Sequence, residues 1–446
     1  MKNLILTLII TLPLTLWGQG WEKTFGGDGN EFGYSVKQTQ DGGFIIVGYT
    51  TSFGNGGNDI YLIKTDSQGD TIWVKTFGGS ENDGGRSIQQ TSDGGFIITG
   101  YTSSFGNGQY DLYLIKTDGN GNEQWSQTFG GIENDYGYSI QQTSDGGFII
   151  TGNTSSFGNG ESDVYLIKTD GNGNEQWSQT FGGIENDYGY SIQQTSDGGF
   201  IITGVYNSTQ NDNGTTFSDL WLLKTDENGI EQWNQKFEGD CSGFVGNSVE
   251  QTQDGGYIIS GTDFTSSVFG SSCSYNTLIK TDGSGIKQWI QNVNYNDQGQ
   301  FISSGNSVKQ TTDGGYIITG YISEHNPNNS WDISVIKTDS QGDTLWTKTF
   351  GGTSYDEGFS VQQIQDGGYI IGGYTRSFGN GESDIYLIKT DGQGNISSTT
   401  EIPLPNPNRK LEKTVNIKGQ EIKPQTNQPI IEIFDDGTVE KKIVVE

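Results

Sequence analysis

The chain has little histidine, little cysteine and few basic residues. His325 is the only histidine among 446 residues, which excludes a metal motif with two histidines and leaves one residue for any Ser-His-Asp or Cys-His catalysis. Acidic residues outnumber basic ones 54 to 24, so the formal net charge is −30. Because such a surface repels polyanions, we expect no nucleic acid partner. With so many carboxylates, pairs arise by chance, so we nominate no catalytic residue.

Long apolar runs are also scarce, apart from one at the N-terminus. Residues 4–17 are apolar except for Thr and Pro13, Lys2 precedes them, and the small Gly18 follows. This pattern is typical of a secretory signal peptide, and the run is shorter than the roughly 20 residues of a membrane span. We therefore predict a signal peptide over residues 1–18, an exported mature chain, and no transmembrane span within it.

The two cysteines fit an exported chain. Cys241 and Cys273 fall in loops that the repeat pattern places on one face of the molecule. Disulfides persist in oxidising compartments outside the cytosol. We predict a disulfide between them, and two unpaired thiols remain the alternative because the Cα separation is not visible in a sequence.

What the chain has in abundance is a repeat. A tryptophan recurs at steps of 52, 52, 52, 56, 56 and 57 residues, and an Asp-Gly-Gly turn returns once in each unit. A period near 50 residues with strand and turn signals alone is typical of a propeller blade. The repeated tryptophans are Trp21, Trp73, Trp125, Trp177, Trp233, Trp289 and Trp346.

Each unit contains four predicted strands. In the first full unit they cover residues 33–40, 43–50, 59–66 and 71–77, which are rich in Ile, Val, Tyr, Phe and Thr. Runs such as residues 44–47 (FIIV) do not alternate with polar residues. Blades that pack against neighbours on both faces explain such runs, and we expect the repeated tryptophan to lie in this blade-to-blade core.

The two ends of the repeat region complement each other. Residues 21–27 (WEKTFGG) read as a fourth strand with no earlier strands, while the last unit, residues 358–391, lacks its fourth strand. An N-terminal strand that pairs into the last blade would close the ring and cover its sheet edges. The sequence therefore predicts an all-β fold over residues 19–395, a seven-bladed β-propeller of four-stranded antiparallel blades closed by the N-terminal strand. The recurring LIKTDGNGNEQW resembles quinoprotein-like and kelch-like propeller repeats, a resemblance that implies the fold and no particular activity.

The composition changes after the last unit. Residues 396–410 contain Pro403, Pro405 and Pro407 and read as a linker, and residues 411–446 form a small C-terminal β segment with strand-like pieces. The segment KTVNIKGQEIKPQTNQPIIEIFDDGTVEKKIVVE resembles the C-terminal sorting signal of proteins that Bacteroidetes bacteria export by the type IX secretion system. The resemblance implies the type IX secretion machinery as a partner through residues 411–446, passage through the periplasm, and a final place on the outer cell surface or in the medium. The alternative is a small appended β unit without a targeting role.

Acidic side chains recur in the loops that lead into successive blades. Three of these loops end in Glu-Asn-Asp, and the aspartates are expected on one face with other acids that precede third strands. Carboxylates are ligands that calcium prefers, so calcium is the one cofactor that we consider. The alternatives are a cationic or hydroxyl-rich ligand at this face and a set of solvated loops. The candidate metal ligands are Asp83, Asp135 and Asp187.

Longer loops of the fourth to sixth units carry aromatic side chains beside Asn and Asp. Loops on a rigid scaffold are common places for recognition, and we expect these to meet a sugar or a protein. The leading hypothesis is an exported or cell-surface propeller that acts as a binding or adhesion module for an extracellular glycan or protein. The alternatives are a secreted carbohydrate-active hydrolase or lyase that uses carboxylates, and a structural spacer without ligand. The candidate ligand-binding residues are Tyr206, Phe264, Tyr295, His325 and Trp331, with Phe269 in the same loops.

Overall fold

The computed structural model describes residues 20–210, 216–264, 274–293, 302–323 and 330–396, and, further along, residues 410–415, 421–423, 429–434 and 439–443. The chain forms two compact units, Met1–Ile396 and Ser397–Glu446. Among the described residues, no helix is long and apolar enough to cross a membrane.

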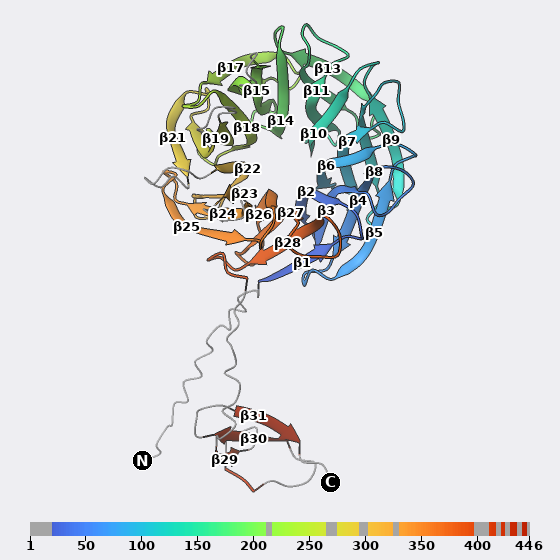
Figure 1. Ribbon diagram of the computed structural model, residues 1–446. Helices are drawn as coiled ribbons and strands as arrows, with labels where there is room; N and C mark the ends of the chain where they lie inside the picture. The colour runs from blue at the N-terminus through green and yellow to red at the C-terminus, as the bar shows by residue number, and fades with distance from the viewer. Residues whose placement is uncertain are drawn as a thin grey trace, which may run out of the picture. The chain divides into compact units, whose positions relative to one another are not determined.

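The first unit is a ring of four-stranded antiparallel sheets, or blades (Figure 1). The innermost strands are β2 (Glu31–Gln38), β6 (Asp83–Gln90), β10 (Asp135–Gln142), β14 (Asn186–Gln194), β18 (Gly243–Gln251), β22 (Ile302–Gln310) and β26 (Asp356–Gln363). The second strands are β3 (Phe44–Thr50), β7 (Phe96–Thr102), β11 (Phe148–Thr154), β15 (Phe200–Gln210), β19 (Tyr257–Phe264), β23 (Tyr316–Ser323) and β27 (Tyr369–Thr375).

The outer half of each blade has a third and an outermost strand. The third strands are β4 (Asp59–Thr65), β8 (Asp111–Thr117), β12 (Asp163–Thr169), β16 (Thr216–Thr225), β20 (Ser274–Thr281), β24 (Asp332–Thr338) and β28 (Asp384–Thr390). The outermost strands are β5 (Thr71–Phe77), β9 (Glu123–Phe129), β13 (Glu175–Phe181), β17 (Glu231–Phe237), β21 (Lys287–Val293), β25 (Thr344–Phe350) and, in the last blade, β1 (Trp21–Phe25). We number the blades from blade 1 (β2 to β5) to blade 7 (β26 to β28 with β1). The all-β propeller is as predicted, and this set of blades is consistent with the predicted seven.

The N-terminal strand closes the ring, as predicted. β1 pairs antiparallel with β28, with Trp21 opposite Lys389 and Phe25 opposite Ile385. Trp21 also reaches blade 1, where its ring lies edge-on to Phe44 with 5.7 Å between the ring centroids. The first described strand thus covers the edge of the last blade and contacts the first one.

The hydrophobic core lies between neighbouring blades. One cluster combines Ile45 and Ile60 of blade 1 with Phe96 and Ile98 of blade 2, and Trp73 packs against it. The second and third strands are buried along almost their whole length, which explains the unbroken apolar runs. The repeated tryptophan is therefore part of the blade-to-blade core, as expected.

Each blade fixes its first turn with a buried lysine. Lys116, on a third strand, is 4 % exposed. Its Nζ lies 2.9 Å from Oδ2 of Asp93 in the Asp-Gly-Gly turn and donates to the carbonyl of Thr117 at 2.9 Å. The ion pair ties the turn between the first two strands to the third strand. The equivalent pairs are Lys64–Asp41, Lys168–Asp145, Lys224–Asp197, Lys280–Asp254, Lys337–Asp313 and Lys389–Asp366.

A closed circuit of hydrogen bonds runs around the ring at the end of the innermost strands. The side-chain oxygen of each final glutamine accepts a backbone N–H from the turn of the preceding blade, as Gln90 does from Gln40 at 2.9 Å. The circuit closes where Gln365 of blade 7 donates to Gln38 of blade 1 at 3.1 Å. The other acceptors are Gln142, Gln194, Gln251, Gln310 and Gln363.

The second unit contains a three-stranded antiparallel sheet of β29 (Leu411–Val415), β30 (Pro429–Phe434) and β31 (Val439–Ile443). β30 lies in the middle, paired with β29 and β31. A further bridge joins Val415 and Glu421. The sorting role of residues 411–446 stays a prediction.

Candidate binding cavity at the centre of the ring

Every innermost strand carries a β-bulge at the same place. In blade 1 the register with β3 shifts between Gly33 and Ser35, which leaves Tyr34 as the extra residue. Bulges re-aim side chains and are enriched beside functional sites. The glycine allows close approach of the blades, since a Cβ at Gly85 would lie 2.5 Å from Cγ2 of Val47 in blade 1. The bulged residues are Tyr34, Arg86, Tyr138, Tyr190, Asn247, Asn306 and Phe359.

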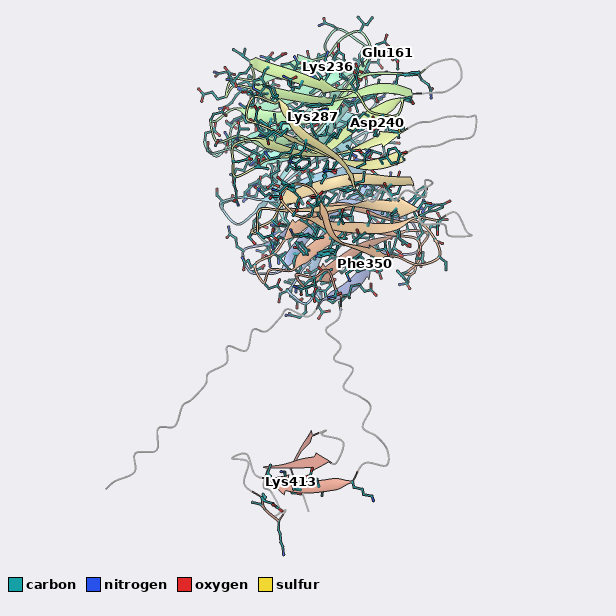
Figure 2. All side chains as sticks on the ribbon, turned by 90° about the vertical axis from the view of Figure 1, so that its left-hand side faces the viewer. Glu161, Lys236, Asp240, Lys287, Phe350 and Lys413 are labelled. Atoms are coloured by element: carbon teal, nitrogen blue, oxygen red, sulfur yellow. The ribbon has the colours of Figure 1, made fainter. Side chains whose placement is uncertain are left out.

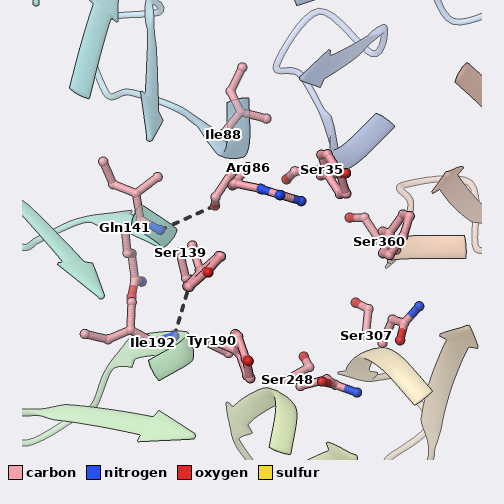
Figure 3. A pocket seen from close by; sticks show the side chains of 18 of the residues that line it. Ser35, Arg86, Ile88, Ser139, Gln141, Tyr190, Ile192, Ser248, Ser307 and Ser360 are labelled. Carbon is pink, nitrogen blue, oxygen red and sulfur yellow. Dashed lines mark hydrogen bonds between the residues drawn. The ribbon is translucent and has the colours of Figure 1, made fainter. Parts of the chain in front are cut away.

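All seven bulged residues line one central cavity of about 290 Å³. Figure 3 shows Arg86 and Tyr190 directed into it from different blades, together with serines from the ring. The cavity is therefore built from equivalent positions that differ in chemistry from blade to blade.

In most blades the serine that follows the bulge joins neighbouring innermost strands. Oγ of Ser139 accepts the N–H of Ile192 at 3.3 Å, and Oγ of Ser248 accepts that of Val308 at 3.2 Å. Dashed lines mark two of these bonds in Figure 3. Part of the hydrogen-bonding capacity of the serines thus holds the ring together. The serines are Ser35, Ser87, Ser139, Ser191, Ser248, Ser307 and Ser360.

Two residues further along, most blades place a carboxamide or carboxylate that accepts a backbone N–H of the next blade. Oε1 of Gln89 accepts the N–H of Gln142 at 2.6 Å, and Oε2 of Glu250 accepts that of Gln310 at 2.8 Å. Gln141, Gln193 and Gln362 do the same. Blades 1 and 6 have Lys37 and Lys309 at this position, and an ammonium group cannot accept a hydrogen bond.

Three cationic side chains line the cavity, namely Lys37, Arg86 and Lys309, and the described lining residues include no Asp or Glu. None of the ion pairs found in the described ranges involves these three cations. Burial and, second, the charge of Lys309 lower the pKa of Lys37 to about 8, although Glu250 partly offsets both. The cavity is positive inside a chain of strongly negative net charge.

Arg86 is held between aromatic rings. Its guanidinium carbon lies 4.1 Å from the ring centroid of Tyr34 and 5.6 Å from that of Tyr101. Its Nε is buried and has no hydrogen-bond partner among the described residues. Stacking fixes the plane of the guanidinium and leaves an N–H at its edge available.

Aromatic side chains cover much of the remaining wall. Tyr34 lies 5.0 Å from Phe359, and Tyr138 lies 5.2 Å from Tyr190, between ring centroids. Tyr136 continues this wall, 6.2 Å from Tyr138 in a stacked arrangement. Blades 7, 1, 3 and 4 thus supply rings, while blade 2 supplies the guanidinium.

The opposite side of the cavity is polar. Nδ2 of Asn247 donates to the carbonyl of Gly305 at 3.0 Å, and Nδ2 of Asn306 donates to Oε1 of Glu357 at 3.0 Å. Burial raises the pKa of Glu357 to about 7, although hydrogen bonds from Asn306 and Tyr374 lower it in part. The wall is therefore asymmetric, with aromatic rings on one side and amides on the other.

The loop aromatics that the sequence nominated do not form this cavity. Tyr206 packs against Trp221 at 5.2 Å, and Nζ of Lys236 on β17 lies 3.1 Å above the Tyr206 ring. Lys236 is labelled in Figure 2. Trp331 is half-buried, 4.3 Å from Tyr355 between centroids, and Phe264 is half-buried at the end of β19. None of these three lines the cavity. Phe269, Tyr295 and His325 lie outside the described residues.

The candidate calcium ligands are buried rather than solvated. Asp83 is 0 % exposed, and its Oδ2 accepts the N–H of Gly79 at 2.8 Å and the hydroxyl of Ser104 at 2.6 Å. Asp135 and Asp187 cap their turns in the same way. Within the described ranges, no three His, Cys, Asp or Glu side chains are placed to share a metal. These aspartates are buried although neighbouring residues of the loops, such as Glu81 and Glu133, are exposed, and calcium binding stays a prediction.

Cys241 is engaged in a disulfide, and its N–H donates to Oδ1 of Asp263 at 3.0 Å. Cys273 lies outside the described residues. The pairing of these two cysteines stays a prediction.

Comparison with known proteins identifies no matching family model. The chain is 28% identical to the regulatory protein FlaEY of Caulobacter vibrioides over 157 residues, which cover 30% of this chain and 16% of FlaEY. Among solved structures, it is similar to the polysaccharide lyase Uly1, with a TM-score of 0.49 and 13% identity over 82% of this chain and 90% of that one. It is also similar to the β-propeller domain of the Trilobed protease from Pyrococcus furiosus, with a TM-score of 0.44 and 10% identity over 86% and 98%. The protein is a β-propeller, and likenesses at these identities concern the fold alone.

Proposed function

We propose that the protein is an exported β-propeller that acts as a binding or adhesion module, and that it holds an extracellular glycan or protein in the central cavity. The observation that carries this proposal is the set of bulged residues. The repeat keeps glycine before the bulge and serine after it, while the bulged position itself is Tyr, Arg, Asn or Phe. All of these residues line one cavity.

The asymmetry of the cavity supports recognition. Residues 117–152 and 169–204 are identical, so the outermost strands of blades 2 and 3, and the first two strands of blades 3 and 4, present the same residues over these stretches. The bulged positions of the cavity combine four kinds of side chain from seven blades, namely Tyr, Arg, Asn and Phe, and such a mixture suits a specific site of small size. Stacked tyrosines suit the apolar faces of sugar rings or an aromatic or aliphatic side chain of a protein.

A carbohydrate-active hydrolase or lyase is the second candidate. Carboxylate-based cleavage of a glycoside needs two acids on either side of the bond. The described residues that line the cavity are cationic, aromatic, aliphatic, amide or hydroxyl in character and include no such pair. This composition favours binding over carboxylate catalysis at this place.

Export rests on the two ends of the chain. We propose that residues 1–18 direct secretion and that residues 411–446 engage the type IX machinery, so that the protein reaches the outer surface or the medium. Deletion of residues 411–446 should retain the protein in the periplasm. Unchanged surface delivery would remove this part of the proposal.

The binding role is tested with the purified mature chain and immobilised polysaccharides and extracellular proteins, scoring retained protein and released soluble product together. We expect saturable retention without product. The variant Tyr138→Asn, which copies the residue of blades 5 and 6, should weaken retention about tenfold. Phe378→Ser serves as control, because Phe378 is 44 % exposed and does not line the cavity. Product formation would favour the enzyme, and the absence of any retention would favour a structural spacer.

A further inference from the structure

The charge of the cavity is opposite to that of the chain. The formal net charge is −30, yet the described lining contains three cations and no carboxylate. Elsewhere the buried lysines of the third strands each have an aspartate partner, such as Asp93 for Lys116 at 2.9 Å. The cavity cations have no equivalent partner among the ion pairs of the described residues, so they are available to an anion.

The hydrogen bonds that link the blades do not explain why Lys37 and Lys309 occupy their positions. At the same position, blades 2, 3, 4 and 7 have glutamines that link to the next blade, such as Gln89 to Gln142. Lys37 and Lys309 interrupt this circuit, and they repel each other across the cavity. Two like charges in a confined space cost stability, and a bound anion would offset that cost.

Arg86 supplies the geometry for a carboxylate. A guanidinium presents its N–H groups in a planar fork that matches the two oxygens of a carboxylate. The face of the Arg86 group is covered by Tyr34 at 4.1 Å, while its buried Nε lacks a partner among the described residues. An unpaired buried donor is costly, so this N–H is poised for an acceptor that comes from outside the chain.

The rest of the wall suits a ring with hydroxyl groups. Tyr34, Tyr138, Tyr190 and Phe359 provide aromatic surface, and Asn247, Asn306 and the serines provide polar groups. A volume of about 290 Å³ lies at the lower end of the range for small-molecule sites, roughly 300–1,000 Å³. Such a space fits one or two sugar units rather than a protein loop.

We propose that the cavity binds an acidic sugar, with the sugar carboxylate against Arg86 and with Lys37 and Lys309 completing the positive charge. This inference rests on the proposed function, because it names the ligand class of the same cavity.

The test is calorimetric titration of the mature chain with four probes. These are a uronic acid disaccharide, the neutral hexose disaccharide of the same linkage, acetate and inorganic phosphate. We expect the uronic acid disaccharide to bind and the neutral disaccharide to bind at least about tenfold more weakly, the usual size of a charge-assisted hydrogen bond. Equal affinity for the neutral sugar would overturn the inference, and so would acetate or phosphate binding as tightly as the uronic acid.

Two variants copy residues that the same fold already uses. Arg86→Asn copies Asn247, and Lys309→Gln copies Gln89. Each should lower the affinity for the uronic acid disaccharide about tenfold to a hundredfold, while Lys309→Gln should fold at least as stably as the native chain. Native affinity in both variants would overturn the inference. If the screen instead retains a neutral glycan or a protein in a way that depends on Tyr138, this inference fails and the proposed function stands.

Discussion

Lys116 and Asp93 form an ion pair of 2.9 Å in which the lysine side chain is 5 % exposed and the aspartate side chain 58 %. The aspartate also accepts the hydroxyl of Thr91 at 2.5 Å and the N–H of Gly95 at 3.0 Å. One carboxylate therefore holds the first turn of the blade closed and neutralises a buried ammonium group.

Removal of this carboxylate should destabilise the blade. Asp93→Asn leaves Lys116 buried without a counter-charge, and we expect a loss of about 1–3 kcal/mol in the free energy of unfolding. Urea denaturation measures it, with Glu227→Gln as control because Glu227 is exposed in a hairpin. Equal stability of the two variants would contradict the role assigned to the pair.

The same pairs predict a loss of stability in acid. Partial burial raises the pKa of Asp93, but hydrogen bonds from Thr91, Lys116 and Gly95 outweigh it and lower the pKa to about 2. The pKa of Asp145 and that of Asp254 are also lowered to about 2. A carboxyl whose folded pKa lies below its unfolded value stabilises the fold above the unfolded pKa, and this contribution is lost as the pH falls through the folded pKa.

Stability should therefore fall between about pH 4 and pH 2. The urea midpoint of unfolding, measured at several pH values in this window, should fall with the pH. The Asp93→Asn variant should lose less stability over this window than the native chain. A native midpoint that stays constant from pH 5 to pH 2 would rule this account out.

The cavity lysines predict a gain of stability at alkaline pH. The pKa of Lys37 is lowered from 10.5 to about 8, first by burial and then by Lys309. A base with a depressed folded pKa binds fewer protons in the folded state between these two values, so stability rises with pH across them. We expect the native chain to gain about 1–3 kcal/mol from pH 8 to pH 10.

Lys37→Gln should abolish most of this gain and should be more stable than the native chain at pH 7. Thermal melts at both pH values measure the difference, and Lys75→Gln on the outermost strand β5 is the control. If the variant keeps the native pH profile, the depressed pKa belongs to another group.

The sequence was sufficient for the fold because every blade repeats the same local signals. Asp-Gly-Gly turns, unbroken apolar second and third strands and the unpaired strand at Trp21 together define closed four-stranded units. Closure by β1 followed from the missing fourth strand of the last unit. The buried partner of each Asp-Gly-Gly turn was missed, since Lys116 reads as an exposed residue until its strand is seen to be buried on both faces.

The sequence placed the candidate ligand-binding residues in long loops, whereas the cavity lies at the bulges of the innermost strands. Long loops drew attention to Tyr206 and Trp331, but those side chains pack against Trp221 and Tyr355 and do not line the cavity. The cavity is instead lined by the bulged residue of the Gly-x-Ser motif and by the residues that follow it, and the variation of the bulged position between Tyr34, Arg86 and Asn247 was the available signal. The alternation of side chains along a strand does not reveal on which face the bulged residue lies, because the bulge adds a residue and changes where its side chain points.

A substitution of Asp83 can distinguish turn capping from calcium binding. Asp83→Ala removes the acceptor for Gly79 and Ser104, and we expect a loss of about 1–3 kcal/mol that does not depend on calcium. The measurement is the melting temperature of the native chain and of Asp83→Ala, each with calcium and with a chelator. A native melting temperature that rises with calcium, and an Asp83→Ala value that does not, would assign the metal role instead.

Trp21 and Trp125 offer a matched pair for the closure of the ring. Both pack edge-on or tilted against the phenylalanine of the next blade, Trp21 on Phe44 at 5.7 Å and Trp125 on Phe148 at 6.0 Å. Replacement of either partly buried tryptophan by alanine should lower the free energy of unfolding by about 2–4 kcal/mol.

The two tryptophans differ in how their strands are connected. Trp125 lies on β9, which the chain joins directly to β8, whereas Trp21 lies on β1, which is held to β28 by strand pairing alone. Trp21→Ala should therefore open the seam of blade 7 and accelerate hydrogen exchange at the amides of β28 at least about tenfold, while Trp125→Ala should leave β28 protected. Equal protection of β28 in both variants would mean that closure depends on the strand pairing of β1 and not on the contact of Trp21 with blade 1.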